Sequence, residues 1–194
     1  MKIRTIVNFL YKFKVLKRIV PTFLKVMVKF FYIKEIKVVH NNLIFLLNPN
    51  NPIDREIYLK DKYESDQITF LEKKIEENDI KIFIDIGAHM GFYSINLSKK
   101  KINIYAFEPI LENFTQLKKN ILVNKIYNIK TYNCALSNIR KLVTMWVPDK
   151  NRTGGFAIFN KDDEALKKYE MKNINTKVIQ SDIGDNLLDI KKSI

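Results

Sequence analysis

Two carboxylates and a short glycine turn are the residues of this sequence that could bind a ligand, judged by their types and spacing. Asp85 closes the apolar run "KIFID", and the turn "GAHMG" of residues 87–91 follows it. Glu108 closes a second apolar run, "INIYAFE". Gly87 permits a sharp turn off a strand, and Gly91 permits close approach to the helix start. A carboxylate at the second strand tip can accept hydrogen bonds from both hydroxyls of a ribose.

These residues favour a ligand that carries positive charge. Asp85 would repel a pyrophosphate, and the spacing G-x-x-x-G lacks the close glycine pair of the dinucleotide fingerprint G-x-G-x-x-G. One acid near a cationic amino-acid tail and another on a ribose suit S-adenosylmethionine. A nicotinamide dinucleotide is the alternative ligand, and a purely structural role for both acids is the other reading. The sequence indicates no metal site.

Apolar runs alternate with helical patterns from Lys81 onward. Strands are expected at residues 81–87, 102–109 and 129–137, and helices at 92–100 and 110–124. This order predicts an α/β fold with a doubly wound, mostly parallel sheet and helices on both faces. Right-handed crossovers would bring the carboxyl ends of the strands, with Asp85 and Glu108, to one edge of the sheet.

The chain, with 194 residues of which 46% are hydrophobic, can bury one sizeable core. We expect a basic segment at residues 1–40, a lead-in at 41–80 and the main domain at 81–194. In the lead-in, "IKVVHNNLIFLLNP" reads as two short strands around a turn at residues 40–42. Helices should follow, the second capped near Ser65 or Asp66.

Most of the net positive charge lies in residues 1–40, which hold ten Lys or Arg and one Glu, a net charge of +9. Lysines interrupt every apolar run, so no membrane span or secretory signal is expected. Pro21 should begin a second helix. Three roles remain open: packing on the domain, an anionic membrane surface, or RNA. Apolar residues recur at roughly helical spacing, namely Ile6, Leu10, Phe13, Val20, Leu24, Met27 and Phe31.

Cys134 is the only cysteine, which excludes an intrachain disulfide framework and fits a reducing compartment. The expected location is therefore the cytoplasm, with the inner face of the membrane as the alternative.

The segments "FIDIGAHMGFYSINLS", "AFEP", "NFTQLKKNILVN" and "NCALS" resemble the FkbM family of S-adenosylmethionine-dependent methyltransferases. The resemblance covers about residues 83–188 and implies a Rossmann-like class I methyltransferase fold. It implies that Glu108 holds the ribose and that Cys134 and Ala135 lie near the adenine. Asn120 and Asn124 match family asparagines and are interpreted as structural caps and turn formers. The implied methionine side of the cofactor site comprises Asp85, Gly87, Ala88, His89 and Gly91.

The resemblance further implies O-methylation of a hydroxyl on a sugar, lipid-linked glycan or small molecule. The acceptor and the catalytic base are not identified, and for His89 a bond to nearby backbone is favoured over a role as base. An RNA methyltransferase is one alternative, although nucleic acid is the less favoured acceptor. A non-catalytic remnant, or a protein that interacts with a membrane surface, is the other.

One part of the family pattern is missing. In the family another buried strand, ending in an acidic turn, follows the segment like "VIQSDIGDNLLDI", whereas this sequence stops at "KKSI". The fold is therefore expected to be incomplete at this end, with residues 82–86 at a sheet edge. Trp146, Phe156 and Phe159 could shield that edge, and Gly154-Gly155 reads as a hairpin turn.

Overall fold

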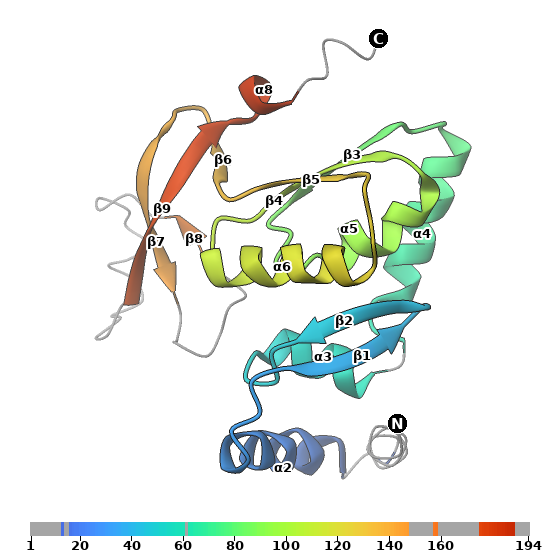
Figure 1. Cartoon of the computed structure of the whole chain (residues 1–194), viewed down its shortest axis with the longest axis vertical. Helices are drawn as coiled ribbons and strands as arrows, with labels where there is room; N and C mark the ends of the chain where they lie inside the picture. Colours follow the sequence, from blue (N-terminus) through green and yellow to red (C-terminus); the bar gives the residue numbers. More distant parts are fainter. Residues whose placement is uncertain (1–12, 14–15, 61, 148–156, 159–174, 189–194) are drawn as a thin grey trace.

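The centre of the molecule is a three-stranded parallel sheet in the order β3-β4-β5 (Figure 1). The computed structural model describes residues 13, 16–60, 62–147, 157–158 and 175–188. The predicted α/β fold with a parallel sheet is confirmed, and its units follow the Rossmann-like order of strand, helix and strand. These elements are β3 (Ile82–Ile86), α5 (Phe92–Leu97), the 3₁₀ turn η1 (Ser98–Lys100), β4 (Asn103–Phe107), α6 (Leu111–Val123) and β5 (Ile129–Tyr132).

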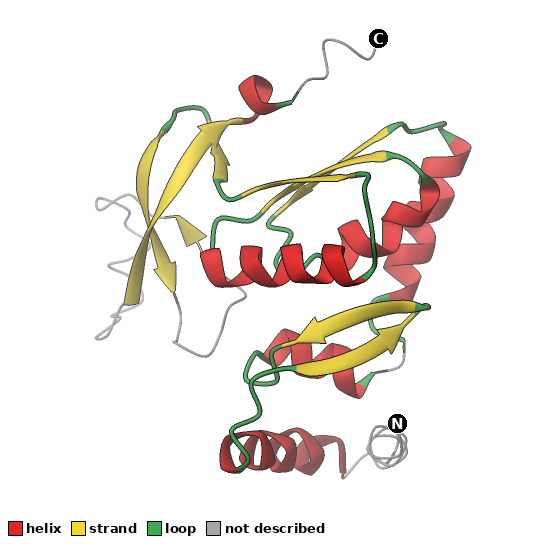
Figure 2. Ribbon diagram, in the orientation of Figure 1, coloured by secondary structure: helices red, strands yellow, loops and turns green. Residues whose placement is uncertain are grey.

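The long helices of the described region gather on one face of this sheet (Figure 2). Phe83 and Ile104 pack with Leu97 of α5 and with Ile75 of α4 (Ser65–Glu77), while Ala106 packs with α6. The opposite face, rich in aromatic side chains, is covered in part by the residues around the short helix α8 (Gly184–Leu187).

Strand β3 forms an edge of the sheet, because its described partner is β4 alone. Ile86, at its end, is 67% exposed, and Ile84 is also exposed. Within the described residues, β3 thus has the exposed apolar edge that was expected for residues 82–86.

The predicted strand at residues 129–137 divides into two pieces that belong to different sheets. After β5 ends at Tyr132, the Asn133 side chain donates to the carbonyl oxygens of Glu108 and Pro109, at 2.8 and 3.2 Å. The chain then enters a four-stranded sheet in the order β6-β9-β7-β8. Its strands are β6 (Ala135–Ser137), β7 (Lys141–Val147), β8 (Ala157–Ile158) and β9 (Asn175–Ile183). Trp146 pairs with Ala157 in this sheet, whereas Gly154, Gly155, Phe156 and Phe159 lie outside the described residues.

The lead-in segment forms the expected pair of short strands. β1 (Ile36–His40) and β2 (Leu43–Leu47) are antiparallel, so the hairpin crosses the expected border between residues 40 and 41. Asn41 and Asn42 both have positive φ, 51° and 60°, as a two-residue type I′ turn requires. The helix α3 (Pro52–Leu59) and then α4 follow. Helix α4 begins at Ser65, close to the expected position, but its N-cap residue is Glu64 and no side chain caps it, so the predicted cap at Ser65 or Asp66 is not observed.

The basic segment contains the helix α2 (Leu16–Phe30), with Pro21 inside it. The prediction that Pro21 begins a new helix is therefore wrong. A proline inside a helix removes one hydrogen bond and disfavours the helix, but Val20 and Leu24 pack against the hairpin core on either side of it. None of the helices in the described residues is long and apolar enough to span a membrane.

Amide side chains of α6 cover the free edge of β2. Asn124 Oδ1 accepts the N–H of Ile44 at 2.7 Å, and its Nδ2 donates to the carbonyl of the same residue at 2.6 Å. Asn120 Oδ1 accepts the N–H of Leu46 at 2.7 Å, while Gln116 donates to the Leu46 carbonyl at 2.8 Å. Asn124 is the C-cap residue of α6, as interpreted from the sequence, and its Nδ2 also donates to the Asn120 carbonyl at 2.7 Å. Together with Asn120 it also acts as a substitute for a neighbouring strand.

Replacing Asn120 with alanine should lower the free energy of unfolding by about 3 kcal/mol, because two buried backbone groups would lose their partner. The Leu46 N–H and the Met90 carbonyl both bond this side chain. Urea unfolding measures the effect. The control Thr115→Ala, on an exposed position of the same helix, should change the value by less than about 0.5 kcal/mol. Equal losses in both variants would contradict the role assigned to Asn120.

Candidate functional site

The loops that follow the strands β3, β4 and β5 meet at Glu108, the residue directly after β4. The N–H groups of Gly87 and Ala88 donate to the carbonyl of Phe107 at 2.8 and 2.9 Å. The next N–H of the same loop, from His89, donates to Glu108 Oε2 at 2.8 Å. The Asn133 side chain reaches the Glu108 carbonyl from the connection after β5. The sequence prediction that these loops lie at one sheet edge therefore agrees with the structure.

The Glu108 carboxyl group is 4% exposed and already has several hydrogen-bond donors. Besides His89, the N–H of Ile110 donates to Oε1 at 2.9 Å, and Asn113 Nδ2 donates to Oε1 at 3.3 Å. A carboxylate offers about four acceptor positions, so these three donors leave about one for another partner. Burial raises the pKa of Glu108, the hydrogen bonds oppose that shift, and the negative charge of Asp85 raises the pKa further. The two carboxyl groups are thus close enough to repel each other.

Asp85 lies at the end of β3 and faces α5. The Ser94 hydroxyl donates to Asp85 Oδ2 at 2.6 Å, and burial raises the pKa of this carboxyl group. Asp85 also borders a hollow of about 630 Å³ between β3 and α4, and Asp66 is a second carboxylate on its wall. The other residues of that wall are Gln67, Phe70, Leu71, Phe83 and Tyr93, so the described lining contains no Lys or Arg. The hollow therefore favours positive charge.

The two glycines of the loop serve different purposes. Gly87 and Gly91 both have left-handed backbone, with φ of +80° and +89°. A Cβ added at Gly91 would lie 2.4 Å from Leu117 Cδ1, so this glycine lets α6 pack against the loop. A Cβ added at Gly87 would meet no heavy atom within 4 Å. The open side of Gly87 is therefore where a ligand could approach the backbone.

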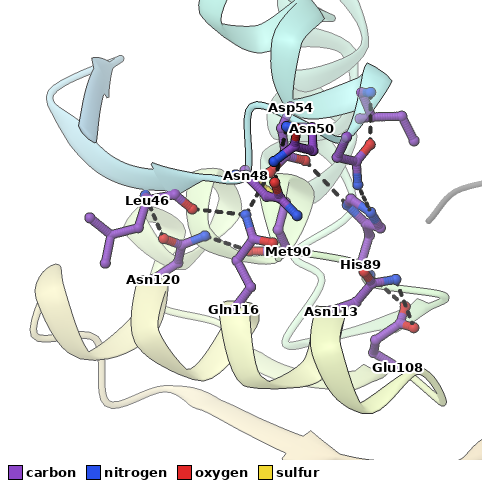
Figure 3. A network of polar contacts seen from close by, with 12 residues as sticks. Leu46, Asn48, Asn50, Asp54, His89, Met90, Glu108, Asn113, Gln116 and Asn120 are labelled. Carbon is purple, nitrogen blue, oxygen red and sulfur yellow. Dashed lines mark hydrogen bonds and ion pairs between the residues drawn. The ribbon is translucent and has the colours of Figure 1, made fainter. Parts of the chain in front are cut away.

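His89 also has left-handed backbone, with φ of 52°, and its ring lies between two residues of the lead-in segment (Figure 3). Its Nε2 is 2.9 Å from Asn51 Nδ2, so Nε2 accepts the amide hydrogen and Nδ1 carries the ring proton. Nδ1 is 4.0 Å from Asp54 Oδ1. Burial lowers the pKa of His89 to about 4, which keeps the ring neutral. The ring thus bonds the Asn51 side chain and lies beside Asp54, whereas the sequence interpretation favoured a bond to nearby backbone.

Asp54 is fully buried and joins the loop to the amide contacts of α6. Its Oδ2 accepts the N–H of Asn48 at 2.7 Å and Nε2 of Gln116 at 2.6 Å. Burial raises the pKa of Asp54 to about 6, against the effect of these hydrogen bonds. Asn51, Asp54 and Gln116 were not predicted from the sequence as neighbours of the site. Asn51 before Pro52 was a visible helix-start signal, but nothing in the sequence connects it with His89.

Cys134 and Ala135, expected near an adenine, are both buried. The Cys134 side chain packs with Tyr105 and Phe107 on the aromatic face of the sheet, and Ala135 packs with Ile110. Burial raises the pKa of the Cys134 thiol, and the charge of Asp182 raises it further. These contacts leave only backbone groups of the two residues for a ligand. Within the described part of the chain, no three His, Cys, Asp or Glu side chains gather as a metal site would require.

Comparisons with protein-family models and with curated proteins found no match. Among solved structures, M. jannaschii TYW2 in complex with AdoMet is 21% identical over 50% of this chain and 42% of that chain, with a TM-score of 0.39. Pyrococcus abyssi tRNA (uracil-54, C5)-methyltransferase in complex with S-adenosyl-L-homocysteine is 20% identical over 51% and 24%, with a TM-score of 0.36. Trm5b from Pyrococcus abyssi is 18% identical over 56% and 34%, with a TM-score of 0.38.

The chain spans less than half the length of these three proteins. Likeness at this level carries no argument about activity or substrate. The fold assignment rests on the strand order and register of the sheet described above.

The neighbouring groups of Asp54 and His89 should give opposite dependences of stability on pH. In the folded protein Asp54 keeps its proton up to about pH 6, so its ionisation lowers stability as the pH rises from about 4 to 6. His89 stays neutral down to about pH 4, so its contribution raises stability over the range from about 4 to 6.5. The two slopes should largely cancel in the wild type.

Replacing either residue should remove its pH dependence. The free energy of unfolding, relative to the wild type, should then change by roughly 2–3 kcal/mol between about pH 4 and 6. Asp54→Asn should gain stability relative to wild type as the pH rises from 4 to 6, and His89→Asn should lose it. Urea unfolding at a series of pH values measures both, and the raised pKa values of Asp85 and Glu108 contribute equally to all three proteins. Parallel pH profiles for the three proteins would refute the assignment.

The two glycines should respond differently to alanine. Gly87→Ala should lower the free energy of unfolding by about 1 kcal/mol, from the left-handed backbone alone. Gly91→Ala should lower it by about 3 kcal/mol or more, because the new methyl group also overlaps Leu117. Thermal and urea unfolding compare the two variants, and a loss at Gly87 as large as that at Gly91 would contradict the open surroundings of Gly87.

Proposed function

We propose that this protein binds S-adenosylmethionine at the tips of β3 and β4 and transfers its methyl group. The finer proposal is O-methylation of a hydroxyl on a sugar, a lipid-linked glycan or a small molecule, as the resemblance to the FkbM family implies. The observation that carries the proposal is the pair of carboxyl groups, Asp85 and Glu108, on neighbouring parallel strands. Bringing two negative charges together is unfavourable unless a positive partner lies nearby.

The residues fit such a ligand in three respects. The hollow beside Asp85 has two carboxylates and, among its described lining residues, no cation, which suits an ammonium group. Glu108 retains about one acceptor position for a ribose hydroxyl, and a second hydroxyl would have to replace Asn113, the longest of its three contacts. The surroundings of Gly87 leave its backbone accessible to a ligand.

When bound, S-adenosylmethionine supplies a methyl group: the acceptor hydroxyl oxygen bonds the methyl carbon and gives its proton to water, while the carbon–sulfur bond breaks and the sulfur keeps the electron pair. The residues of this chain would then orient the reactants and offset positive charge. Asp85 is held in place by Ser94, and the loop of residues 87–91 is held by Glu108. Both nitrogens of the His89 ring face other side chains, so His89 acts as a support for the loop and not as the base.

RNA is the second acceptor class, favoured by the net charge of +9 in residues 1–40. It predicts RNA binding that weakens steeply as the salt concentration rises. A hydroxyl acceptor on a sugar or small molecule predicts no such binding.

Isothermal titration with S-adenosylhomocysteine tests cofactor binding. The wild type should bind, and Asp85→Asn should bind at least about tenfold more weakly, because an amide cannot pair with an ammonium group. Asp85→Asn retains an oxygen that can accept from Ser94, so the fold should persist, as far-UV circular dichroism would show. The control Glu112→Gln removes an exposed carboxylate at the start of α6 and should bind like the wild type.

Two results would overturn the proposal. One is the absence of binding by folded wild-type protein. The other is equal affinity of the wild type and Asp85→Asn, which would leave Asp85 with a structural role in bonding Ser94.

A further inference from the structure

Helix α2 presents two apolar stripes, and among the described residues only one of them packs on the rest of the molecule. Val20 is buried, and Leu24, one turn later, packs against the same core cluster as Val38 of the hairpin. Val20 and Leu24 belong to the apolar residues that recur at helical spacing in the sequence, and this contact explains why these two are apolar. It fixes the orientation of α2 on the β1–β2 hairpin.

The second stripe faces outward. Its members are 55% to 74% exposed, although all are large and apolar: Ile19, Phe23, Val26 and Phe30. In a helix that turns 100° per residue, these positions fall within an arc of about 60° and extend over about 17 Å. Phe31 and Tyr32, which follow the helix, are exposed as well. An exposed apolar surface of this kind indicates an interaction site.

This outer stripe, defined as Ile19, Phe23, Val26 and Phe30, lies at one end of the molecule. Figure 1 shows α2 beyond the β1–β2 hairpin, on the side away from the β3-β4-β5 sheet. The surface is therefore separate from the candidate cofactor site, and its role does not depend on the proposed function.

The charge of the surrounding sequence indicates the partner. Residues 1–40 carry a net charge of +9, and Lys34 and Lys37, just after the helix, are exposed. A helix with an apolar stripe in a strongly basic segment suits the interface of an anionic bilayer, where side chains enter the acyl boundary and cations remain near the headgroups.

We propose that α2 docks this protein on the surface of an anionic lipid membrane through the outer stripe. RNA would also attract the positive charge, but aliphatic side chains such as Ile19 and Val26 gain nothing from a phosphate backbone. A second copy of this chain could cover the stripe, but it would bring another basic segment against the first and so oppose association. Of these three partners, the bilayer satisfies both the apolar stripe and the charge.

Vesicle flotation with the full chain tests the proposal. The wild type should bind vesicles that mix phosphatidylglycerol with phosphatidylcholine, and bind pure phosphatidylcholine vesicles much more weakly. The double variant Phe23→Gln/Phe30→Gln keeps every charge and should bind the mixed vesicles at least about tenfold more weakly. The matched control Leu122→Gln/Tyr127→Gln removes two exposed apolar side chains from another surface and should bind like the wild type.

A second measurement reports the depth of insertion without depending on the double variant. Cys134 is buried, so a cysteine introduced by Phe23→Cys can be labelled selectively with an environment-sensitive fluorophore. Its emission should rise and shift to shorter wavelength when mixed vesicles are added. A label introduced by Tyr127→Cys should stay unchanged.

Three results would overturn the proposal. The first is equal vesicle binding by the wild type and the Phe23→Gln/Phe30→Gln variant, with no response of the label at residue 23. The second is salt-sensitive RNA binding by a protein that ignores anionic vesicles. The third is a dimer in sedimentation that the double variant dissociates, with no binding to vesicles.

Discussion

The carboxylate of Glu108 is the contact on which the arrangement of the site depends. It accepts hydrogen bonds from the loop after β3, through His89, and from the start of α6, through Ile110 and Asn113. Asn133 reaches the backbone of the same residue from the connection after β5. Glu108, a residue only 4% exposed, therefore positions the loops around the tips of three parallel strands, two of them through its carboxylate and the third through its backbone carbonyl.

The loop of residues 87–91 is supported from its other side by the lead-in segment. Asn51 bonds the ring of His89, and Asp54, which lies beside this ring at 4.0 Å, accepts a hydrogen bond from Gln116 of α6. Burial favours a neutral form for both titratable groups, which raises the pKa of Asp54 and lowers that of His89. The β1–β2 hairpin and α3 are therefore part of what shapes the site, although they precede the parallel sheet in the sequence.

Patterns within short stretches of sequence predicted the strands β3 and β4, the helix α6 and the placement of Asp85 and Glu108. Each of these depends on apolar periodicity and on residues at the element's own ends. Contacts between distant segments were not predictable in this way. Asn124 is the C-cap residue of α6, as its interpretation as a cap implied, and its side chain donates to the Asn120 carbonyl. The bonds from Asn120 and Asn124 to β2 were not predictable from the helix alone. Pro21 was misjudged because local rules take no account of the packing of Val20 and Leu24.

The amide contacts between α6 and β2 recur every four residues along the helix and every two residues along the strand, and these two spacings differ in length. Four residues of helix advance about 6.0 Å, whereas two residues of strand advance about 6.7 Å, so the mismatch grows to about 1.4 Å after two steps. Asn124 and Asn120 meet Ile44 and Leu46 directly. At the third step the longer Gln116 binds the Asp54 carboxylate, which in turn binds the N–H of Asn48. Here the helix replaces a strand partner for two steps, and the buried Asp54 bridges the gap where the two periods diverge.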